Sequence, residues 1–163
     1  MYRWKAGLKM EIERKFLVDH LPKDYRSYPC KQIEQAYLCT EPVVRIRKED
    51  EEYILTYKSK GLMCREEYNL PLDEKSYQHL KSKADGNLIS KKRYHIPYQK
   101  WTIELDIFEG CFEGLFLAEV EFSSQEEAEN FTPVSWFGKE VTWSTRYHNS
   151  TLSQASPEEY LNA

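Results

Sequence analysis

Glu11-Ile12-Glu13-Arg14-Lys15-Phe16 is the most informative stretch of the sequence, because charged and apolar residues alternate along it. In an extended strand Glu11, Glu13 and Lys15 lie on one face, and Ile12 and Phe16 lie on the other. The same period of two recurs in six further segments, at 44–47, 53–58, 65–70, 91–96, 101–108 and 117–122. The pattern predicts an antiparallel sheet of at least seven strands, each with a charged face and an apolar face.

The segments between these strands show where helices form. Residues 73–84 follow Pro71, begin with a capping residue, Asp73, and end before Asp85-Gly86, which predicts a helix. Residues 124–131 begin with a serine and two early glutamates, a helix-capping pattern, and residues 156–161 are expected to form a last helical turn. An eighth strand is expected at 33–37 or at 139–143. We therefore expect one β-rich domain with peripheral helices.

Like charges recur two residues apart on the charged faces. The members of each pair share a face: Arg45 and Arg47, Lys91 and Arg93, Glu104 and Asp106, Glu119 and Glu121. A single strand of this kind is ordinarily the polar surface of a sheet. The repetition is costly, however, because like charges on one face repel each other. A divalent cation would offset the carboxylates and a polyanion would offset the cations. We therefore expect a closed barrel with its charged faces inward and its apolar faces covered by helices.

The 163 residues carry a net charge of −4, and 14% of them are aromatic, which is typical of a folded globular domain. A negative net charge gives no bulk attraction to nucleic acid or to an anionic membrane, so neither partner is expected. No apolar run reaches the about 20 residues that span a bilayer, and residues 1–10 do not resemble a signal peptide. The four cysteines lack the spacing of zinc or redox sites. They are expected to be free thiols of a cytoplasmic monomer or homodimer.

In their order and spacing the charged motifs resemble the CYTH superfamily, the triphosphate tunnel metalloenzymes, and in particular its bacterial inorganic triphosphatase-like members. The opening segment looks like the ExExK motif of the family. Eight further motifs follow it in order: Arg45-Ile46-Arg47, Thr56-Tyr57-Lys58, Arg65-Glu66-Glu67, Lys91-Lys92-Arg93-Tyr94, Glu104-Leu105-Asp106, Glu119-Val120-Glu121, Lys139-Glu140-Val141-Thr142 and Arg146-Tyr147-His148-Asn149. The resemblance implies an α+β fold, a closed antiparallel eight-stranded β-barrel (a tunnel) with a charged interior and peripheral helices. It implies an N-terminal extension at 1–9, the CYTH domain at 10–153 and a C-terminal tail at 154–163.

The resemblance also implies roles for the charged residues. Carboxylates that bind the metal, Mg²⁺ or Mn²⁺, are expected at Glu11, Glu13, Asp106, Glu119 and Glu121, with Glu104 as a secondary ligand. Contacts to substrate phosphates are expected from Lys15, Arg45, Arg47, Lys58, Arg65, Lys91, Arg93, Lys139 and Arg146. The catalytic set is expected to comprise Glu11, Glu13, Lys15, Arg47 and Glu119. The histidines His20, His79, His95 and His148 are expected to be surface or structural residues.

These features predict a divalent-metal-dependent hydrolase of a small-molecule triphosphate, with inorganic tripolyphosphate as the leading substrate and pyrophosphate and phosphate as products. The resemblance also allows a nucleoside or thiamine triphosphatase, or a class IV adenylyl cyclase in which Tyr57, Tyr68 and Tyr94 would supply a pocket for the base. A further alternative is a polyphosphate-binding module with impaired catalysis. It arises because Ser144 and Asn69 stand where acidic residues are common in the family.

Overall fold

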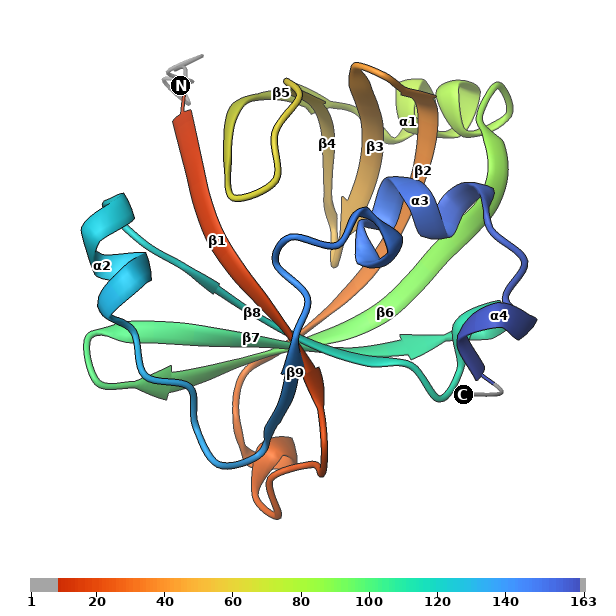
Figure 1. Cartoon of the computed structure of the whole chain (residues 1–163). Helices are drawn as coiled ribbons and strands as arrows, with labels where there is room; N and C mark the ends of the chain where they lie inside the picture. Colours follow the sequence, from red (N-terminus) through yellow and green to blue (C-terminus); the bar gives the residue numbers. More distant parts are fainter. Residues whose placement is uncertain (1–8, 162–163) are drawn as a thin grey trace.

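The computed structural model describes residues 9–161 of the chain (Figure 1). Its strands are β1 (Lys9–Val18), β2 (Cys30–Thr40), β3 (Val43–Glu49), β4 (Glu52–Lys58), β5 (Cys64–Leu72), β6 (Asp85–Tyr98), β7 (Trp101–Glu109), β8 (Phe116–Glu121) and β9 (Phe137–Glu140). Its helices are α1 (Glu74–Lys81), α2 (Gln125–Asn130), α3 (Asn149–Gln154) and α4 (Glu158–Leu161), with 3₁₀ turns η1 (Tyr25–Ser27), η2 (Gly110–Phe112) and η3 (Thr145–Tyr147). The expected N-terminal extension at 1–9 lies outside the described residues, apart from Lys9.

Strands β1 to β8 form a closed antiparallel barrel. The hydrogen-bonded order is β5-β4-β3-β2-β6-β7-β8-β1, and the pairing of β1 with β5 closes the ring. This closure confirms the predicted fold class, and all seven alternating segments lie in ring strands. Both segments considered for the eighth strand contain extended backbone, but only 33–37 belongs to the ring, as part of β2. Strand β9 pairs with β1 alone and lies outside the ring.

The helices form at the predicted places, with one addition. The Asp73 carboxylate accepts a hydrogen bond from the Ser76 amide at the start of α1, and the Ser124 hydroxyl accepts one from the Glu127 amide at the start of α2. Helix α3 was not expected, because it is only six residues long and its N-cap residue, His148, makes no side-chain capping bond. None of the helices in residues 9–161 is long and apolar enough to cross a membrane.

The apolar faces of the strands point away from the barrel axis, as predicted. Ile12 and Phe16 of β1 pack with Phe131, which follows α2, in the largest core cluster. On the opposite side of the barrel, Tyr77 of α1 covers Ile46 of β3 and Ala36 of β2. Figure 1 shows α1 and α2 lying outside different parts of the ring. Because helices and loops bury the outer faces, the charged faces are free to point inward.

One end of the barrel interior is apolar, which the sequence analysis did not anticipate. Ile89, Phe108 and Leu117 lie in phase with the inward charged residues of β6, β7 and β8, and all three are fully buried. Leu152 of α3 packs against them and closes this end. We call it the plugged end. At the other end, the open end, the side chains of Glu104 and Glu121 are partly exposed.

Candidate functional site

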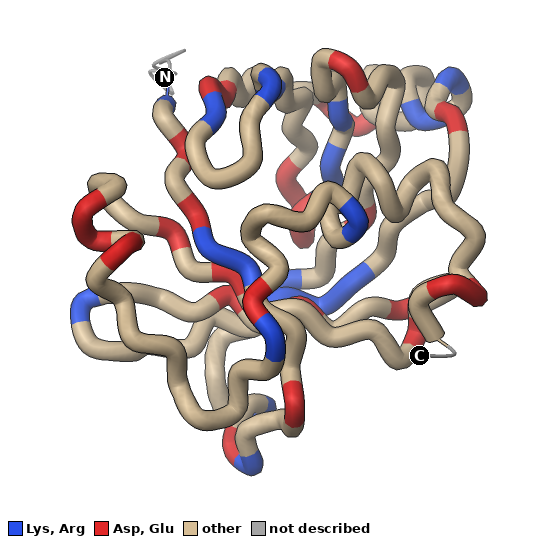
Figure 2. The backbone as a smooth tube through the Cα atoms, in the orientation of Figure 1, with Lys and Arg blue, Asp and Glu red and all other residues tan. Residues whose placement is uncertain are grey.

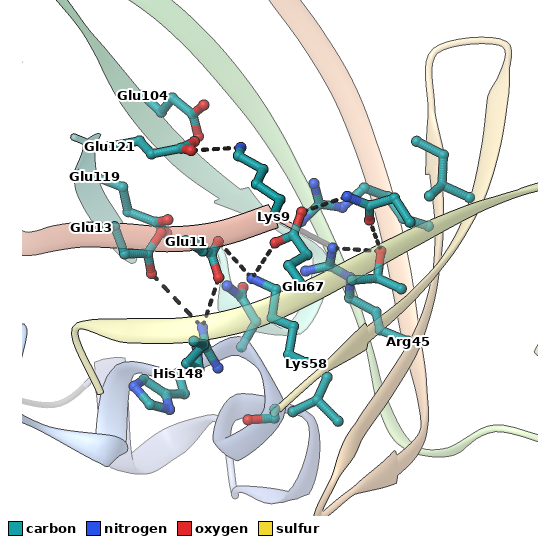
Figure 3. A pocket seen from close by; sticks show the side chains of 18 of the residues that line it. Lys9, Glu11, Glu13, Arg45, Lys58, Glu67, Glu104, Glu119, Glu121 and His148 are labelled. Carbon is teal, nitrogen blue, oxygen red and sulfur yellow. Dashed lines mark hydrogen bonds and ion pairs between the residues drawn. The ribbon is translucent and has the colours of Figure 1, made fainter. Parts of the chain in front are cut away.

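The charged inward faces enclose a cavity of about 400 Å³, which we call the main cavity (Figure 3). It is lined by residues of all eight ring strands, by His148 and by the first residues of α3. Its charged lining residues among positions 9–161 are Lys9, Glu11, Glu13, Lys15, Arg45, Arg47, Glu49, Lys58, Arg65, Glu67, Arg93, Glu104, Glu119 and Glu121. Charges of both signs also follow one another along the tube in Figure 2. The inward orientation predicted from the alternation is therefore present in the structure.

Carboxylates form one wall of the main cavity. The register places Glu13 opposite Glu121 and Glu104 opposite Glu119, so that strands β1, β7 and β8 bring the carboxylates of one face together. Figure 3 shows this wall, with Glu11 next to Glu13. Burial and the neighbouring carboxylates of Glu119 and Glu11 together raise the pKa of Glu13 to about 8. Such a raised pKa marks a group that lacks sufficient positive charge around it.

Glu119 lies where the carboxylate wall meets the cations. Its Oε1 is 3.5 Å from Lys15 Nζ and 3.6 Å from Arg93 Nη2. Burial alone would raise the pKa of Glu119, but Lys15 and Arg93 hold it well below its usual range. Glu119 is therefore ionised at neutral pH, in contrast to Glu13.

Cations form the facing wall. Arg45 and Arg47 extend from β3, and the Arg47 Nε donates a hydrogen bond of 2.9 Å to the amide oxygen of Gln35. Burial and the guanidinium groups of Arg45 and Arg93 together lower the pKa of Arg47 to about 10. Three guanidinium groups that repel one another in a buried site indicate an anionic ligand, because such a ligand would relieve the repulsion.

Lys58 and Glu67 connect the two walls. Lys58 Nζ donates to Glu11 Oε1 at 2.8 Å and lies 3.3 Å from Glu67 Oε2. Burial would raise the pKa of Glu67, but Lys58 lowers it to about 2. Glu67 was not among the predicted site residues, although it shares a strand face with Arg65 and the phase of β5 was sufficient to include it.

Asp106 and Lys91, predicted as a metal ligand and a phosphate contact, do not line the main cavity. Both side chains are fully buried beside the plugged end. The Asp106 carboxylate accepts hydrogen bonds from Lys91 Nζ at 2.5 Å and from Arg93 Nε and Nη2 at 2.6 and 2.7 Å. Lys91 also donates to the side-chain oxygen of Asn149, at the start of α3. Both carboxylate oxygens of Asp106 accept hydrogen bonds, so this residue positions Arg93 from outside the cavity lining.

Two more predicted phosphate contacts lie elsewhere. Lys139 is an exposed residue of β9, which is outside the ring. Arg146 is exposed in η3, where its guanidinium donates to the carbonyl oxygen of Glu159 and lies 4.5 Å from the centre of the Tyr160 ring. The other predicted residues of the metal, phosphate and catalytic sets all line the main cavity.

Several lining residues were not predicted from the sequence. They are Lys9, Tyr37, Val43, Glu49, Ile54, Thr56, Glu67, Asn69, His148, Asn149 and Ser150. Thr56 donates to Asn69 Oδ1 at 2.6 Å, and Asn69 Nδ2 donates to Glu67 at 2.5 Å. Asn69 thus orients a carboxylate of the site. Ser144, the other departure from the family pattern, does not line the main cavity.

A divalent cation fits the carboxylate wall. Glu11 Oε2 and Glu119 Oε1 are buried carboxylate oxygens that accept no hydrogen bond within the described residues. Hard cations such as Mg²⁺ bind carboxylate oxygens of this kind. In residues 9–161 no group of three or more His, Cys, Asp or Glu side chains is arranged to hold a metal ion by itself. A cation at this wall would therefore need further ligands, such as the waters and substrate phosphate oxygens that Mg²⁺ usually binds.

His148 gives the site a measurable dependence on pH. Burial, together with the charges of Lys15 of β1, Arg65 of β5 and Lys58 of β4, lowers the pKa of this imidazole to about 4, against the opposing charge of Glu119. The folded pKa lies below the ordinary value of 6.5, so the unfolded chain binds the proton more readily. The stability contributed by neutral His148 is therefore complete above pH 6.5 and is lost as the pH falls toward 4.

We therefore expect a smaller acid destabilisation in His148→Gln than in the wild-type protein. The expected difference in the change of unfolding free energy between pH 6.5 and 4 is about 1–2 kcal/mol, a value reduced for the part of the ring that solvent screens. Urea titrations at several pH values measure it. His20→Gln, at an exposed loop position, is the control and should follow the wild-type curve. Parallel curves for His148→Gln and the wild type would contradict the expectation.

Comparison with known proteins agrees with the architecture. The CYTH domain family matches residues 9–156. The chain is 38% identical over 152 residues to the inorganic triphosphatase of Nitrosomonas europaea, covering 90% of this chain and 99% of that protein. It is 34% identical over 148 residues to the inorganic triphosphatase of Acetivibrio thermocellus, covering 87% and 92%. The crystal structure of the inorganic triphosphatase NE1496 superposes with a TM-score of 0.68 at 36% identity, over 89% of this chain and 95% of that one. The chain belongs to the CYTH domain family.

Proposed function

We propose that the protein hydrolyses inorganic tripolyphosphate to pyrophosphate and phosphate, with Mg²⁺ or Mn²⁺. The observation that supports this most directly is the main cavity, in which buried arginines and lysines face a wall of buried carboxylates. A metal–triphosphate complex supplies the positive charge that the carboxylates lack and the negative charge that the guanidinium groups lack. The two relatives named inorganic triphosphatase, at 38% and 34% identity, support the same reaction.

The cationic wall would bind and orient the phosphates. Arginine can form two parallel hydrogen bonds to a phosphate group, whereas lysine acts as a point charge. Arg45 and Arg47 from β3 and Arg93 from β6 would hold successive phosphoryl groups, and Lys15 would stand between them and Glu119. The Nε–H group of Arg45 is available to donate to a phosphate oxygen, because it has no hydrogen-bond partner among the described residues. These side chains neutralise the charge on the transferred phosphoryl group and on the leaving diphosphate.

The carboxylate wall would hold the cation through Glu11, Glu13, Glu119 and Glu121, with Glu104 beside them. A bound divalent cation neutralises phosphate oxygens and lowers the pKa of a coordinated water. Glu119, ionised and close to both walls, would position the attacking water relative to the phosphates. The barrel wall and the apolar plug limit the access of bulk water, which strengthens these electrostatic interactions.

The lining of the main cavity favours an inorganic triphosphate over a nucleotide. Tyr37 is the one aromatic lining residue apart from His148 in the described part of the chain, and its side chain is almost fully buried. Tyr57 and Tyr68, considered for a base pocket, pack against each other with ring centres 5.9 Å apart and do not line the cavity. Tyr94 packs against Tyr25 instead. No side chain of this set offers a surface on which a base could stack inside the barrel.

The reducing cytoplasm is the compartment that we propose. Cys30, Cys39, Cys64 and Cys111 are all free thiols in the structure. Disulfides are rare in the cytoplasm and common in secreted proteins, so four unpaired thiols favour a reducing environment.

A phosphate-release panel tests the proposed function. The substrates are tripolyphosphate, ATP, thiamine triphosphate and pyrophosphate, each with Mg²⁺, Mn²⁺ or Ca²⁺. We expect tripolyphosphate with Mg²⁺ or Mn²⁺ to be hydrolysed fastest, because the cavity binds phosphates and offers no site for a base. Equal or faster turnover of ATP would contradict the substrate assignment. Tight binding of tripolyphosphate without phosphate release under any metal would instead indicate a binding module.

A further inference from the structure

A second cavity of about 490 Å³, the rear cavity, lies at the plugged end of the barrel. It is bounded by the β2–β3 turn, by the loop between β4 and β5, and by η3 and α3. The residues that line it and not the main cavity include Thr40, Ser59, Lys60, Thr151 and Gln154. Five residues line both cavities: Val43, Lys58, Arg65, His148 and Ser150. These shared residues form the wall between the two cavities, where α3 lies beside the β4–β5 loop.

Arg65 in this wall is held by ion pairs. Its side chain is nine-tenths buried, with 10% of its surface exposed. Its Nη2 lies 3.7 Å from Glu11 Oε2 and 4.0 Å from Glu13 Oε1, distances that exceed hydrogen-bonding distance. Among residues 9–161 these two ion pairs are the polar contacts found for the guanidinium, although this group carries five N–H donors. A buried guanidinium with unused donors at the junction of two cavities indicates an acceptor that is supplied by a ligand.

The two ends of the barrel interior differ in the balance of their charges. At the open end the carboxylates of Glu104, Glu121 and Glu49 lie at the cavity mouth, each paired with a cation, which is Arg93, Lys9 and Lys31 respectively. Around the rear cavity the ionised residues are Lys58, Lys60 and Arg65, with Glu41 as the one carboxylate among its described lining residues. The rest of its polar lining consists of hydroxyl, amide and imidazole groups, and no Phe, Tyr or Trp is among the described residues that line it. This chemistry suits a phosphate group and offers nothing to a base or another aromatic group.

We propose that the rear cavity is a second phosphate-binding subsite, which adjoins the main cavity across Arg65 and His148. Its ligand is a tetrahedral phosphate group, either released orthophosphate or the fourth phosphoryl group of a linear polyphosphate. Arg65 donates to this phosphate from the shared wall, and Lys60 and the hydroxyl of Ser59 contact it from the β4–β5 loop. The proposal rests on the proposed function for the origin of the phosphate, but binding at the subsite can be measured without turnover.

The test uses the full chain with its main cavity filled. The protein is saturated with tripolyphosphate in the presence of a chelator, so that no divalent cation supports hydrolysis, and inorganic phosphate is then titrated calorimetrically. We expect the wild-type protein to bind one orthophosphate under these conditions. Lys60→Glu should weaken this binding by at least about fivefold, the effect of about 1 kcal/mol of charge interaction near a surface. Lys75→Glu, the same charge change at an exposed position of α1, is the matched control and should bind phosphate like the wild type.

Linear tetraphosphate distinguishes the two sources of the phosphate group. If the subsite takes a fourth phosphoryl group, Lys60→Glu raises the KM for tetraphosphate more than the KM for tripolyphosphate. If only orthophosphate binding weakens, the subsite holds the released product. Absence of orthophosphate binding to the tripolyphosphate-saturated protein, or equal binding by Lys60→Glu and wild type, would overturn the proposal. Failure of tripolyphosphate itself to bind in the first step would count against the proposed function, and the two failures are therefore distinguishable.

Discussion

Glu119→Gln is expected to lower kcat for tripolyphosphate hydrolysis by roughly 10²–10³-fold, the loss typical of removing one preorganised charged group from an active site. The substitution keeps the shape of the side chain and removes its charge. Glu119 Oε1 lies within 3.6 Å of both Lys15 and Arg93, and it belongs to the carboxylate wall that would bind the cation. Its loss therefore weakens cation binding and leaves two cations with less counter-charge. Phosphate release at saturating Mg²⁺ or Mn²⁺ measures the effect.

Glu66→Gln is the matched control for this variant. Glu66 precedes Glu67 on β5 and is exposed, so its carboxylate points to the outer face of the barrel. The same chemical change should therefore leave kcat within about twofold of wild type, as is usual for surface positions. Thermal unfolding of both variants establishes that they are folded. A folded Glu119→Gln protein with more than half of the wild-type rate would remove Glu119 from the proposed catalytic set.

The alternation of residue types was sufficient to predict the barrel and most of its lining. Side chains alternate between the two faces of every strand, so the phase of Glu11 and Glu13 in β1 determined which face they occupy. The same argument placed Arg45, Arg47 and Glu119 on inward faces, and the main cavity contains all of them. It also predicted that outer faces would need cover, and α1 and α2 provide it. These features could be predicted because they depend on the alternation of residues within each strand, which is visible in the sequence.

The alternation of residues along a strand does not reveal how deep each inward side chain lies along the barrel axis. Asp106 shares a face with Glu104 on β7, yet it lies beside the apolar plug and not at the cavity surface. Its depth is set by the stagger between strands and by the docking of α3, which are contacts between residues distant in sequence. His148 escaped prediction for a related reason. It lies in a short connection without a repeating pattern, and the barrel places it in the lining only after the chain has folded.

Asp106→Asn is expected to lower the free energy of unfolding by about 3–5 kcal/mol, the usual consequence of removing one partner from a buried ion pair. Lys91 and Asp106 are both fully buried, and the Asp106 carboxylate is the acceptor for Lys91 and for two nitrogen atoms of Arg93. An amide leaves the fully buried Lys91 without a counter-charge and leaves Arg93 with Glu104 and Glu119 as its remaining carboxylate neighbours. Urea denaturation measures the loss. Arg93 would also lose the support that directs it into the main cavity, so the rate of phosphate release should fall as well.

Two comparisons separate this structural role from metal binding by Asp106. Asp85→Asn, at an exposed position of the same strand as Lys91, is the matched control and should change stability by less than about 0.5 kcal/mol. The double variant Asp106→Leu with Lys91→Met removes that pair together, so it should recover part of the stability that Asp106→Asn loses, because an apolar pair avoids the unpaired buried Lys91. If Asp106→Asn is as stable as the wild type but binds Mg²⁺ or Mn²⁺ more weakly, the structural role is wrong. Asp106 would then be a metal ligand, as the ordered motifs of the sequence suggested, and its contacts with Lys91 and Arg93 would not hold in the metal-bound protein.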